Sequence, residues 1–267
     1  MANTVFFAWQ MDTPAELNKD FIWRALQDAT ANLATGAQPE LSPRPEKDTE
    51  GVSGNPNIVE TIFRRISECS IFVADLTLVA ETRKGKKAPN PNVLLELGYA
   101  ARCIGWARTI LVMNNTSGGG ADLPFDILQH RWPIEYRVTE HTLVRDKRYS
   151  SLTEVLTEAV KACEEHTLAR AREMFLALDT ATFELVALYE HTAVIPMRLP
   201  AKKMGQVLTS LQENLAFRRL VDLGAVRVIS EPEVAYAWTS DGQRMIREIN
   251  AEQPMLLSML RAHATSG

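Results

Sequence analysis

Short apolar runs and amphipathic segments alternate along the first half of the chain. Three runs rich in β-branched and aromatic residues have the length of buried strands: Thr4–Trp9, Ser70–Thr77 and Thr109–Asn114. The segments between them repeat apolar residues at helical spacing, which predicts amphipathic helices over residues 14–32, 56–68 and 92–105. The pattern therefore predicts strands and helices in regular succession.

Local signals refine these boundaries. Two of the predicted helices start with an N-cap residue followed by proline: Thr13–Pro14 and Asn55–Pro56. A polar stretch, Gly36–Gly54, holds a short extended segment near Arg44–Asp48, and Arg131–Tyr136 predicts an edge strand with its proline near the beginning. Strands that alternate with helices indicate the α/β class, with a doubly wound, mainly parallel sheet up to about residue 138.

The second half of the chain has a different pattern. Residues 150–178 predict a long helix, interpreted as the last helix of the first domain and a connector. Short helices follow at 183–189, 201–208 and 211–223, the last closed by Gly224, and then a hairpin of 226–229 and 234–238 and a final helix starting at Thr239. This order, with the phrase L-x-x-L-G-A-V…W-T-x-x-G-x-x-M-I from Leu220 to Ile246, resembles a winged helix-turn-helix domain. We expect two domains, residues 1–165 and 166–267.

Charge weakens the case for nucleic-acid binding by this second domain. Residues 165–267 hold 11 Lys and Arg against 12 Asp and Glu, whereas a phosphate-binding surface usually shows a basic stripe. Acidic residues also fall on the predicted recognition helix and wing. DNA or RNA contact stays open through a local patch of Lys202, Lys203, Arg218, Arg219 and Arg227. A protein-interaction or oligomerisation module is the favoured alternative.

Composition limits the class of protein further. The chain has 267 residues, of which 46% are apolar and 23% charged, and its net charge of −4 creates no global attraction to nucleic acid or anionic membrane. Cys69, Cys103 and Cys163 lack a metal-binding spacing and fit free thiols in a reducing compartment. The N-terminus lacks signal-peptide features, and no apolar run reaches the roughly 18 residues of a membrane span. We expect a soluble, cytoplasmic protein with no membrane partner.

Two carboxylates mark the candidate site. Asp75 ends the central apolar run, and Glu96 lies one turn inside the next helix. In a parallel sheet Asp75 would lie at the carboxyl edge, where open α/β sheets bind ligands. A pair of carboxylates in one crevice indicates acid–base or nucleophilic chemistry on a small molecule. The alternative is that Asp75 caps a turn and Glu96 is a surface charge.

The loop after the first strand could form a third wall of this site. It carries Gln10 and Asp12, which either face a ligand or only cap and turn the chain. No G-x-G-x-x-G motif follows the first strand, which disfavours a dinucleotide-binding Rossmann domain. The glycines at 118–120 lack the Lys-Ser/Thr of a phosphate-binding loop, and the basic segment 81–87 is more typical of a solvated loop than of a phosphate site.

The central motif resembles a known family. Ala74-Asp75-Leu76-Thr77 and Asn90-Pro91-Asn92-Val93-Leu94-Leu95-Glu96-Leu97-Gly98-Tyr99-Ala100 are similar to the nucleoside 2-deoxyribosyltransferases and to the related TIR-like nucleotide-binding domains of bacterial defence proteins. The resemblance covers about residues 4–138, and the E-x-G-Y-A helix is its most specific part. It implies a flavodoxin-like fold and an N-glycosidic bond as the target.

The resemblance also implies roles for single residues. Glu96 would be the nucleophile or the carboxylate that stabilises an oxocarbenium ion, and Asp75 would contact the base or act as general acid. Asn92 would bind a sugar hydroxyl or a phosphate, and Trp9 would stack on a base or lie buried. The expected substrate contacts are Trp9, Gln10, Asp12, Thr77, Asn92 and Asn114.

Two features depart from that family pattern. Met11 occupies a position where TIR-like relatives often carry a small polar residue, which puts ribose or phosphate contacts there in doubt. The charged segment between Thr77 and Pro89 is longer than a compact deoxyribosyltransferase needs, and it favours a bulkier or regulated ligand.

The sequence thus predicts an N-glycosidase or nucleosidase that acts on NAD⁺ or a (deoxy)nucleotide, without metal or cofactor. The combination with a winged helix resembles retron effectors and favours a toxin or anti-phage setting, with a homo-oligomer or a defence-system partner. The alternatives are a catalytically silent nucleotide sensor and a ligand-responsive DNA-binding regulator.

Overall fold

A computed structural model describes residues 3–34, 43–47, 58–81, 83, 85–139, 147–196, 210–229, 235–253 and 255–265. The chain divides into two compact units, Met1–His166 and Thr167–Gly267.

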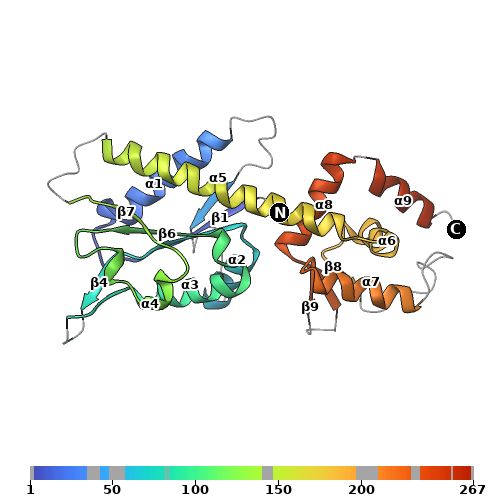
Figure 1. The fold of residues 1–267 in the computed structure, drawn as a ribbon, viewed down its shortest axis with the longest axis horizontal. Helices are drawn as coiled ribbons and strands as arrows, with labels where there is room; N and C mark the ends of the chain where they lie inside the picture. Colours follow the sequence, from blue (N-terminus) through green and yellow to red (C-terminus); the bar gives the residue numbers. More distant parts are fainter. Residues whose placement is uncertain are drawn as a thin grey trace. The chain divides into compact units, whose positions relative to one another are not determined.

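Unit 1 is built on a five-stranded parallel sheet (Figure 1). Its strands are β1 (Thr4–Ala8), β2 (Arg44–Lys47), β3 (Ile71–Asp75), β6 (Thr109–Asn114) and β7 (Ile134–Tyr136). They lie in the order β2-β1-β3-β6-β7, and every neighbouring pair is parallel. This is the strand order of a flavodoxin-like sheet, so the predicted fold class is confirmed.

Helices cover both faces of the sheet because its central strands are apolar on both sides. Val5 and Phe7 of β1 pack with α1 (Lys19–Leu33) and the first part of α5 (Lys147–Leu176). Phe6 and Ala8 point the other way and pack with α2 (Ile58–Glu68), α3 (Pro91–Cys103) and the short α4 (Phe125–Leu128). The alternation of side chains along one strand therefore assigns the two helical layers.

The predicted start of the first helix is wrong. Thr13 and Pro14 precede a 3₁₀ turn, η1 (Ala15–Leu17), and α1 begins only at Lys19 after Asn18. Thr13 does not cap α1, whose N-cap position is Asn18, and its hydroxyl accepts a hydrogen bond from Gln10 Nε2 at 2.7 Å. The second predicted start, Asn55–Pro56, lies outside the described residues.

Two further elements of unit 1 differ from the prediction. The charged segment after Thr77 is flanked by a small antiparallel hairpin, β4 (Leu78–Glu81) with β5 (Lys87–Pro89), which the sequence pattern did not reveal. The third helix starts at Pro91 rather than Asn92, because Asn90 is the N-cap. One-turn 3₁₀ segments, η3 (Trp106–Arg108) and η4 (Gly120–Asp122), complete the unit.

Unit 2 combines helices with a three-stranded antiparallel sheet of order β8-β10-β9. Its elements are the last turns of α5, then α6 (Thr180–Tyr189), β8 (Val194–Pro196), α7 (Ser210–Asp222), β9 (Val226–Ile229), β10 (Ala235–Trp238), α8 (Ser240–Glu252) and α9 (Leu256–Thr265). The predicted hairpin and the helix that follows it are present. Strand β8 and helix α9 were not predicted, and the helix expected at 201–208 lies outside the described residues.

Two local devices explain the boundaries in unit 2. Gly224 closes α7 at φ 77°, where the amides of Gly224 and Ala225 donate back to the carbonyls of Val221 and Leu220. Thr239 caps α8 by accepting from the Gly242 amide at 3.0 Å. The chain therefore turns from α7 into β9, and from β10 into α8, at positions that the sequence pattern marks.

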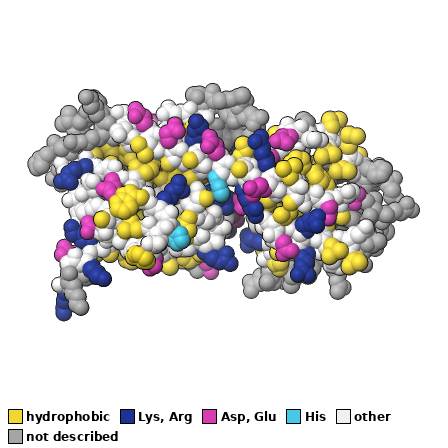
Figure 2. Space-filling view, in the orientation of Figure 1, with side chains coloured by type: hydrophobic (Ala, Val, Ile, Leu, Met, Phe, Trp, Pro, Cys, Tyr) yellow, Lys and Arg dark blue, Asp and Glu magenta, His cyan; other side chains and the backbone are white. Residues whose placement is uncertain are grey.

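The surface carries mixed charge. Figure 2 shows basic and acidic side chains interspersed over the visible faces of both units, with no continuous basic stripe among the residues it colours. No helix within the described ranges is long and apolar enough to span a membrane.

Candidate active site

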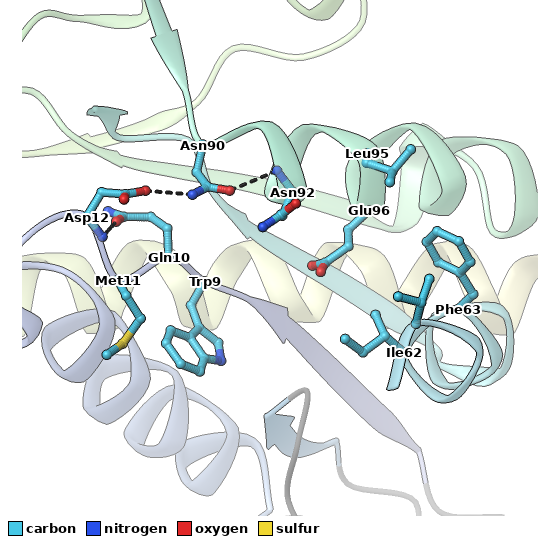
Figure 3. A pocket seen from close by; sticks show the side chains of 11 residues that line it. Trp9, Gln10, Met11, Asp12, Ile62, Phe63, Asn90, Asn92, Leu95 and Glu96 are labelled. Carbon is cyan, nitrogen blue, oxygen red and sulfur yellow. Dashed lines mark hydrogen bonds between the residues drawn. The ribbon is translucent and has the colours of Figure 1, made fainter. Parts of the chain in front are cut away.

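A pocket of about 380 Å³ lies at the carboxyl end of β1, beside the N-terminal turns of α2 and α3 (Figure 3). Strands β1 and β3 are neighbours at the point where the chain order of the sheet reverses, and such switch points are where doubly wound sheets bind ligands. The lining residues come from the loop after β1 and from the two helices: Trp9, Gln10, Met11, Asp12, Val59, Ile62, Phe63, Asn90, Asn92, Leu95 and Glu96.

Glu96 provides a carboxylate inside this pocket. Its side chain extends from α3 into the space between Trp9 and Ile62 (Figure 3). Apolar side chains of α2 form the wall beyond it, where Phe63 stacks on Tyr99 with ring centroids 4.5 Å apart. The carboxylate therefore lies where polar and apolar walls meet.

Asn90 fixes the N-terminus of α3 and ties it to the first-strand loop. Its Oδ1 accepts from the amides of Asn92, at 2.8 Å, and Val93, at 3.4 Å. Its Nδ2 donates to Asp12 Oδ2 at 2.6 Å. One side chain thus caps the helix that carries Glu96 and holds the opposite wall of the pocket.

Gln10 stabilises the loop after β1 through hydrogen bonds of its side chain. The side chain is buried, and its Oε1 accepts from the backbone amides of Asp12 and Thr13. Its Nε2 donates to Thr13 Oγ1 and, at 3.4 Å, to Asp75 Oδ2. Both ends of the amide are therefore engaged by the protein, which makes Gln10 a support of the loop although it also lines the pocket.

Trp9 lies half-buried at the edge of the pocket. The Lys19 ammonium sits over the indole, 4.0 Å from the ring centroid, so a cation–π contact holds the ring in place.

Asp75 does not line the pocket. Its side chain is fully buried and accepts from the Thr77 amide, the Thr77 hydroxyl, Asn18 Nδ2 and Gln10 Nε2. Burial raises the pKa of this carboxyl above its ordinary value, although the hydrogen bonds from Thr77, Asn18 and Gln10 oppose the shift. The predicted contact of Asp75 with the base does not fit this position, because Gln10 lies between the carboxylate and the pocket.

Thr77 and Asn114 belong to the same buried network. Thr77 Oγ1 accepts from Asn18 Nδ2 and from the Asn114 amide, at 2.5 and 2.9 Å. Asn114 Nδ2 donates to the carbonyls of Leu17 and Val138, so it joins the end of β6 to two neighbouring segments. Neither side chain lines the pocket, and both stabilise the edge of the sheet beneath it.

The structure therefore brings together five of the eight predicted residues of unit 1: Trp9, Gln10, Asp12, Asn92 and Glu96. It adds Asn90, whose position before Pro91 is itself an N-cap signal that the sequence could have revealed. The apolar wall of Val59, Ile62 and Phe63 could not be recognised, because helical periodicity does not separate residues that face a ligand from residues that face the core.

The residues of the predicted nucleic-acid patch differ in their surroundings, and Arg227 is exposed on β9. Arg219 bonds to Asp179 at 2.6 Å, and Arg218 lies 4.0 Å from Asp222. Lys202 and Lys203 lie outside the described residues. Arg218 and Arg219 thus have acidic neighbours, which weakens their attraction for phosphate. In the same described part of the chain, no group of three His, Cys, Asp or Glu side chains is arranged to hold a metal ion.

Comparisons with known proteins add little to this geometry. No family model matches the sequence, and no curated protein matches it. A solved structure of a 2-desoxiribosyltransferase from Leishmania mexicana is 18% identical; the match covers 57% of this chain and 97% of that one, with a TM-score of 0.31. A TM-score this low supports no conclusion about the fold or the function of this chain. The chain's own geometry defines the class: a flavodoxin-like α/β unit with a carboxylate-bearing pocket at its switch point.

Proposed function

We propose that unit 1 is an enzyme that cleaves the N-glycosidic bond of a nucleotide, with NAD⁺ as the first candidate substrate and a (deoxy)nucleotide as the second. The observation that supports this most is the Glu96 carboxylate, placed in the pocket between an apolar wall and a polar one. A nucleotide has the same division, because an aromatic base and a hydroxylated sugar meet at the bond to be broken.

The chemistry needs a negative charge at that junction. When the C1′–N bond breaks, its electron pair leaves with the base and positive charge develops on the sugar. Glu96 would stabilise that charge or form a bond to C1′, and water would then supply a hydroxyl to C1′ and a proton to the medium. Trp9, Ile62 and Phe63 would hold the base through apolar contact.

The buried position of Asp75 favours NAD⁺ among the candidates. A neutral purine or pyrimidine leaves as an anion unless an acid protonates it, and Asp75 lies behind Gln10 rather than in the pocket. Nicotinamide leaves NAD⁺ as a neutral molecule and needs no proton. The reaction would then require only the one carboxylate that the pocket presents beside the apolar wall.

We also propose that unit 2 is a winged-helix-like module that binds a partner. The sheet order β8-β10-β9, with α7 before the hairpin and α8 after it, supports such a module as the partner-binding part of the protein. The setting in anti-phage defence rests on the sequence resemblance alone.

Base release tests the proposed function. Purified full-length protein is incubated with NAD⁺ and with a panel of ribo- and deoxyribonucleotides, and the free base is separated by chromatography. We expect release of nicotinamide, or of one nucleobase, by the wild type. Nucleotide binding without release of any base would instead indicate a catalytically silent sensor.

A further inference from the structure

The polarity of the pocket changes along α3. Asn90 and Asn92 lie at the N-terminus of the helix. Glu96 lies about 6 Å beyond Asn92 along the helix axis at the usual helical rise. Figure 3 shows Asp12 and Asn90 at one end of the pocket, Ile62 and Phe63 at the other, and Glu96 between them. With the anomeric carbon at Glu96, the base lies against α2 and the sugar extends toward Asp12.

Asp12 is held in place at this polar end by two separate contacts. Its backbone amide donates to Gln10 Oε1, and its Oδ2 accepts from Asn90 Nδ2 at 2.6 Å. Gln10 is anchored on Asp75, and Asn90 is anchored on the first turn of α3. A loop carboxylate fixed by two such supports is preorganised to receive a hydrogen-bond donor from a ligand.

Charge determines what this end of the pocket accepts. Among the described lining residues the charged ones are Asp12 and Glu96, and none is Lys or Arg. The first amides of α3 already donate to Asn90: those of Asn92 and Val93 to its side chain, and that of Leu94 to its carbonyl. Lys19 is a cation beside Trp9 and sits over its ring, but it is not among the described lining residues. A phosphate would therefore meet a carboxylate here, whereas a hydroxyl would find an acceptor.

We propose that Asp12 is a specificity residue that accepts a hydrogen bond from the 2′,3′-hydroxyl edge of the sugar. The inference rests on the proposed function, since a nucleotide carries phosphate at its 5′ position and only the 2′,3′ edge offers hydroxyls. Asp12 thereby orients the ligand, with the base against α2, C1′ at Glu96 and the 5′ end directed away from Asp12.

Ligand binding to an inactive protein tests this role. Full-length Glu96→Gln protein is titrated by calorimetry with adenosine, its 2′-deoxy and 3′-deoxy analogues, and its 5′- and 3′-monophosphates. The same five forms of nicotinamide riboside replace them if nicotinamide is the base that the wild type releases. The titrations are repeated with Asp12→Asn added, and with Asp126→Asn added as a matched loss of an exposed carboxylate on α4, outside the pocket.

We expect at least one deoxy analogue and the 3′-monophosphate to bind about tenfold more weakly than the nucleoside, because each loses or opposes a hydrogen bond to a charged acceptor. The 5′-monophosphate binds within about threefold of the nucleoside. Asp12→Asn reduces the tenfold differences to about twofold, and Asp126→Asn leaves them unchanged.

Other results would overturn the inference. If Asp12→Asn leaves the differences in affinity between the analogues intact, or if no member of the series binds, Asp12 does not recognise the sugar hydroxyls. The unfolding temperature of each variant shows whether the fold is kept. Base release by the wild type is measured separately: a binding pattern that depends on Asp12 without base release would refute the proposed reaction and leave the binding role standing.

Discussion

At the scale of single residues, the two carboxylates of the central motif have different environments. Glu96 faces a pocket, whereas Asp75 is enclosed by Thr77, Asn18 and Gln10. Thr77, Asn18 and Gln10 donate hydrogen bonds to it, which opposes the rise in its pKa that burial causes. We interpret Asp75 as a positioning residue that supports the Asp12 loop through Gln10.

Burial of Asp75 predicts a pH-dependent contribution to stability. The pKa of this carboxyl is raised from 3.8, so between that value and the raised pKa the folded state holds a proton that the unfolded state releases. The unfolding free energy from this group is therefore highest below 3.8 and falls as pH rises through the window. Urea unfolding of wild type and Asp75→Asn between pH 4 and 7 measures it: the advantage of the wild type should shrink as pH rises.

Asp75→Asn should also be less stable than the wild type at the acid end of that range. The new amide would face the amide donors of Gln10 and Asn18, which leaves buried donors unpaired at a cost of about 1–3 kcal/mol. Asp126→Asn serves as the control for general effects of removing an acid. A constant difference between wild type and Asp75→Asn at all pH values would contradict the raised pKa.

Sequence reasoning could reach some of these residues and not others. Glu96 was predicted from its position on a helix after the central strand, and Gln10 and Asp12 from the loop after the first strand, whereas Trp9 came from the family resemblance. The hydrogen-bonded enclosure of Asp75 and Thr77 could not be predicted, because it depends on Asn18, which lies 57 and 59 residues away from them in the chain. Long-range enclosure of this kind leaves no periodic signal in the sequence.

At the scale of elements, α3 depends on a single cap that has two functions. Asn90→Ala removes the acceptor for the first-turn amides and should lower the unfolding free energy by about 1 kcal/mol. Asn90→Ser keeps a good cap and should recover most of that loss. Both variants lose the Nδ2 amide that reaches Asp12, because the serine hydroxyl is shorter and is used by the cap, so both should raise the KM of the substrate. Equal destabilisation by the two substitutions would show that the cap contributes nothing.

Two helical glycines should respond oppositely to alanine. A Cβ at Gly242 would lie 2.0 Å from the carbonyl oxygen of Ala225, so Gly242→Ala forces α8 away from the start of β9 and should cost about 3 kcal/mol. A Cβ at Gly98 would meet nothing within 4 Å, and Gly98→Ala should be neutral or stabilise by up to about 1 kcal/mol. Thermal unfolding of the two variants compares them directly, and a large loss at Gly98 would contradict the open environment of the motif.

Elements with strong periodicity were predictable, and those set by tertiary pairing were not. The central strands and α2, α5 and α7 follow their apolar patterns. Strand β8 and the β4–β5 hairpin have three or four residues per strand, too short to show a period, and they exist because a partner strand lies beside them. Helix α1 begins later than the sequence pattern predicts, and the Thr13 hydroxyl bonds to Gln10 rather than to the helix.

At the scale of the whole molecule, the pocket lies entirely in unit 1, while unit 2 has a core of its own. Every described residue that lines the pocket precedes residue 97 and belongs to unit 1.

The most direct test of the central claim is the rate of base release by Glu96→Gln relative to the wild type, with the substrate that the wild type turns over. Loss of the carboxylate at the anomeric carbon should lower kcat by at least about a hundredfold, with unfolding temperature and nucleotide binding retained. Undiminished base release by Glu96→Gln would contradict the account.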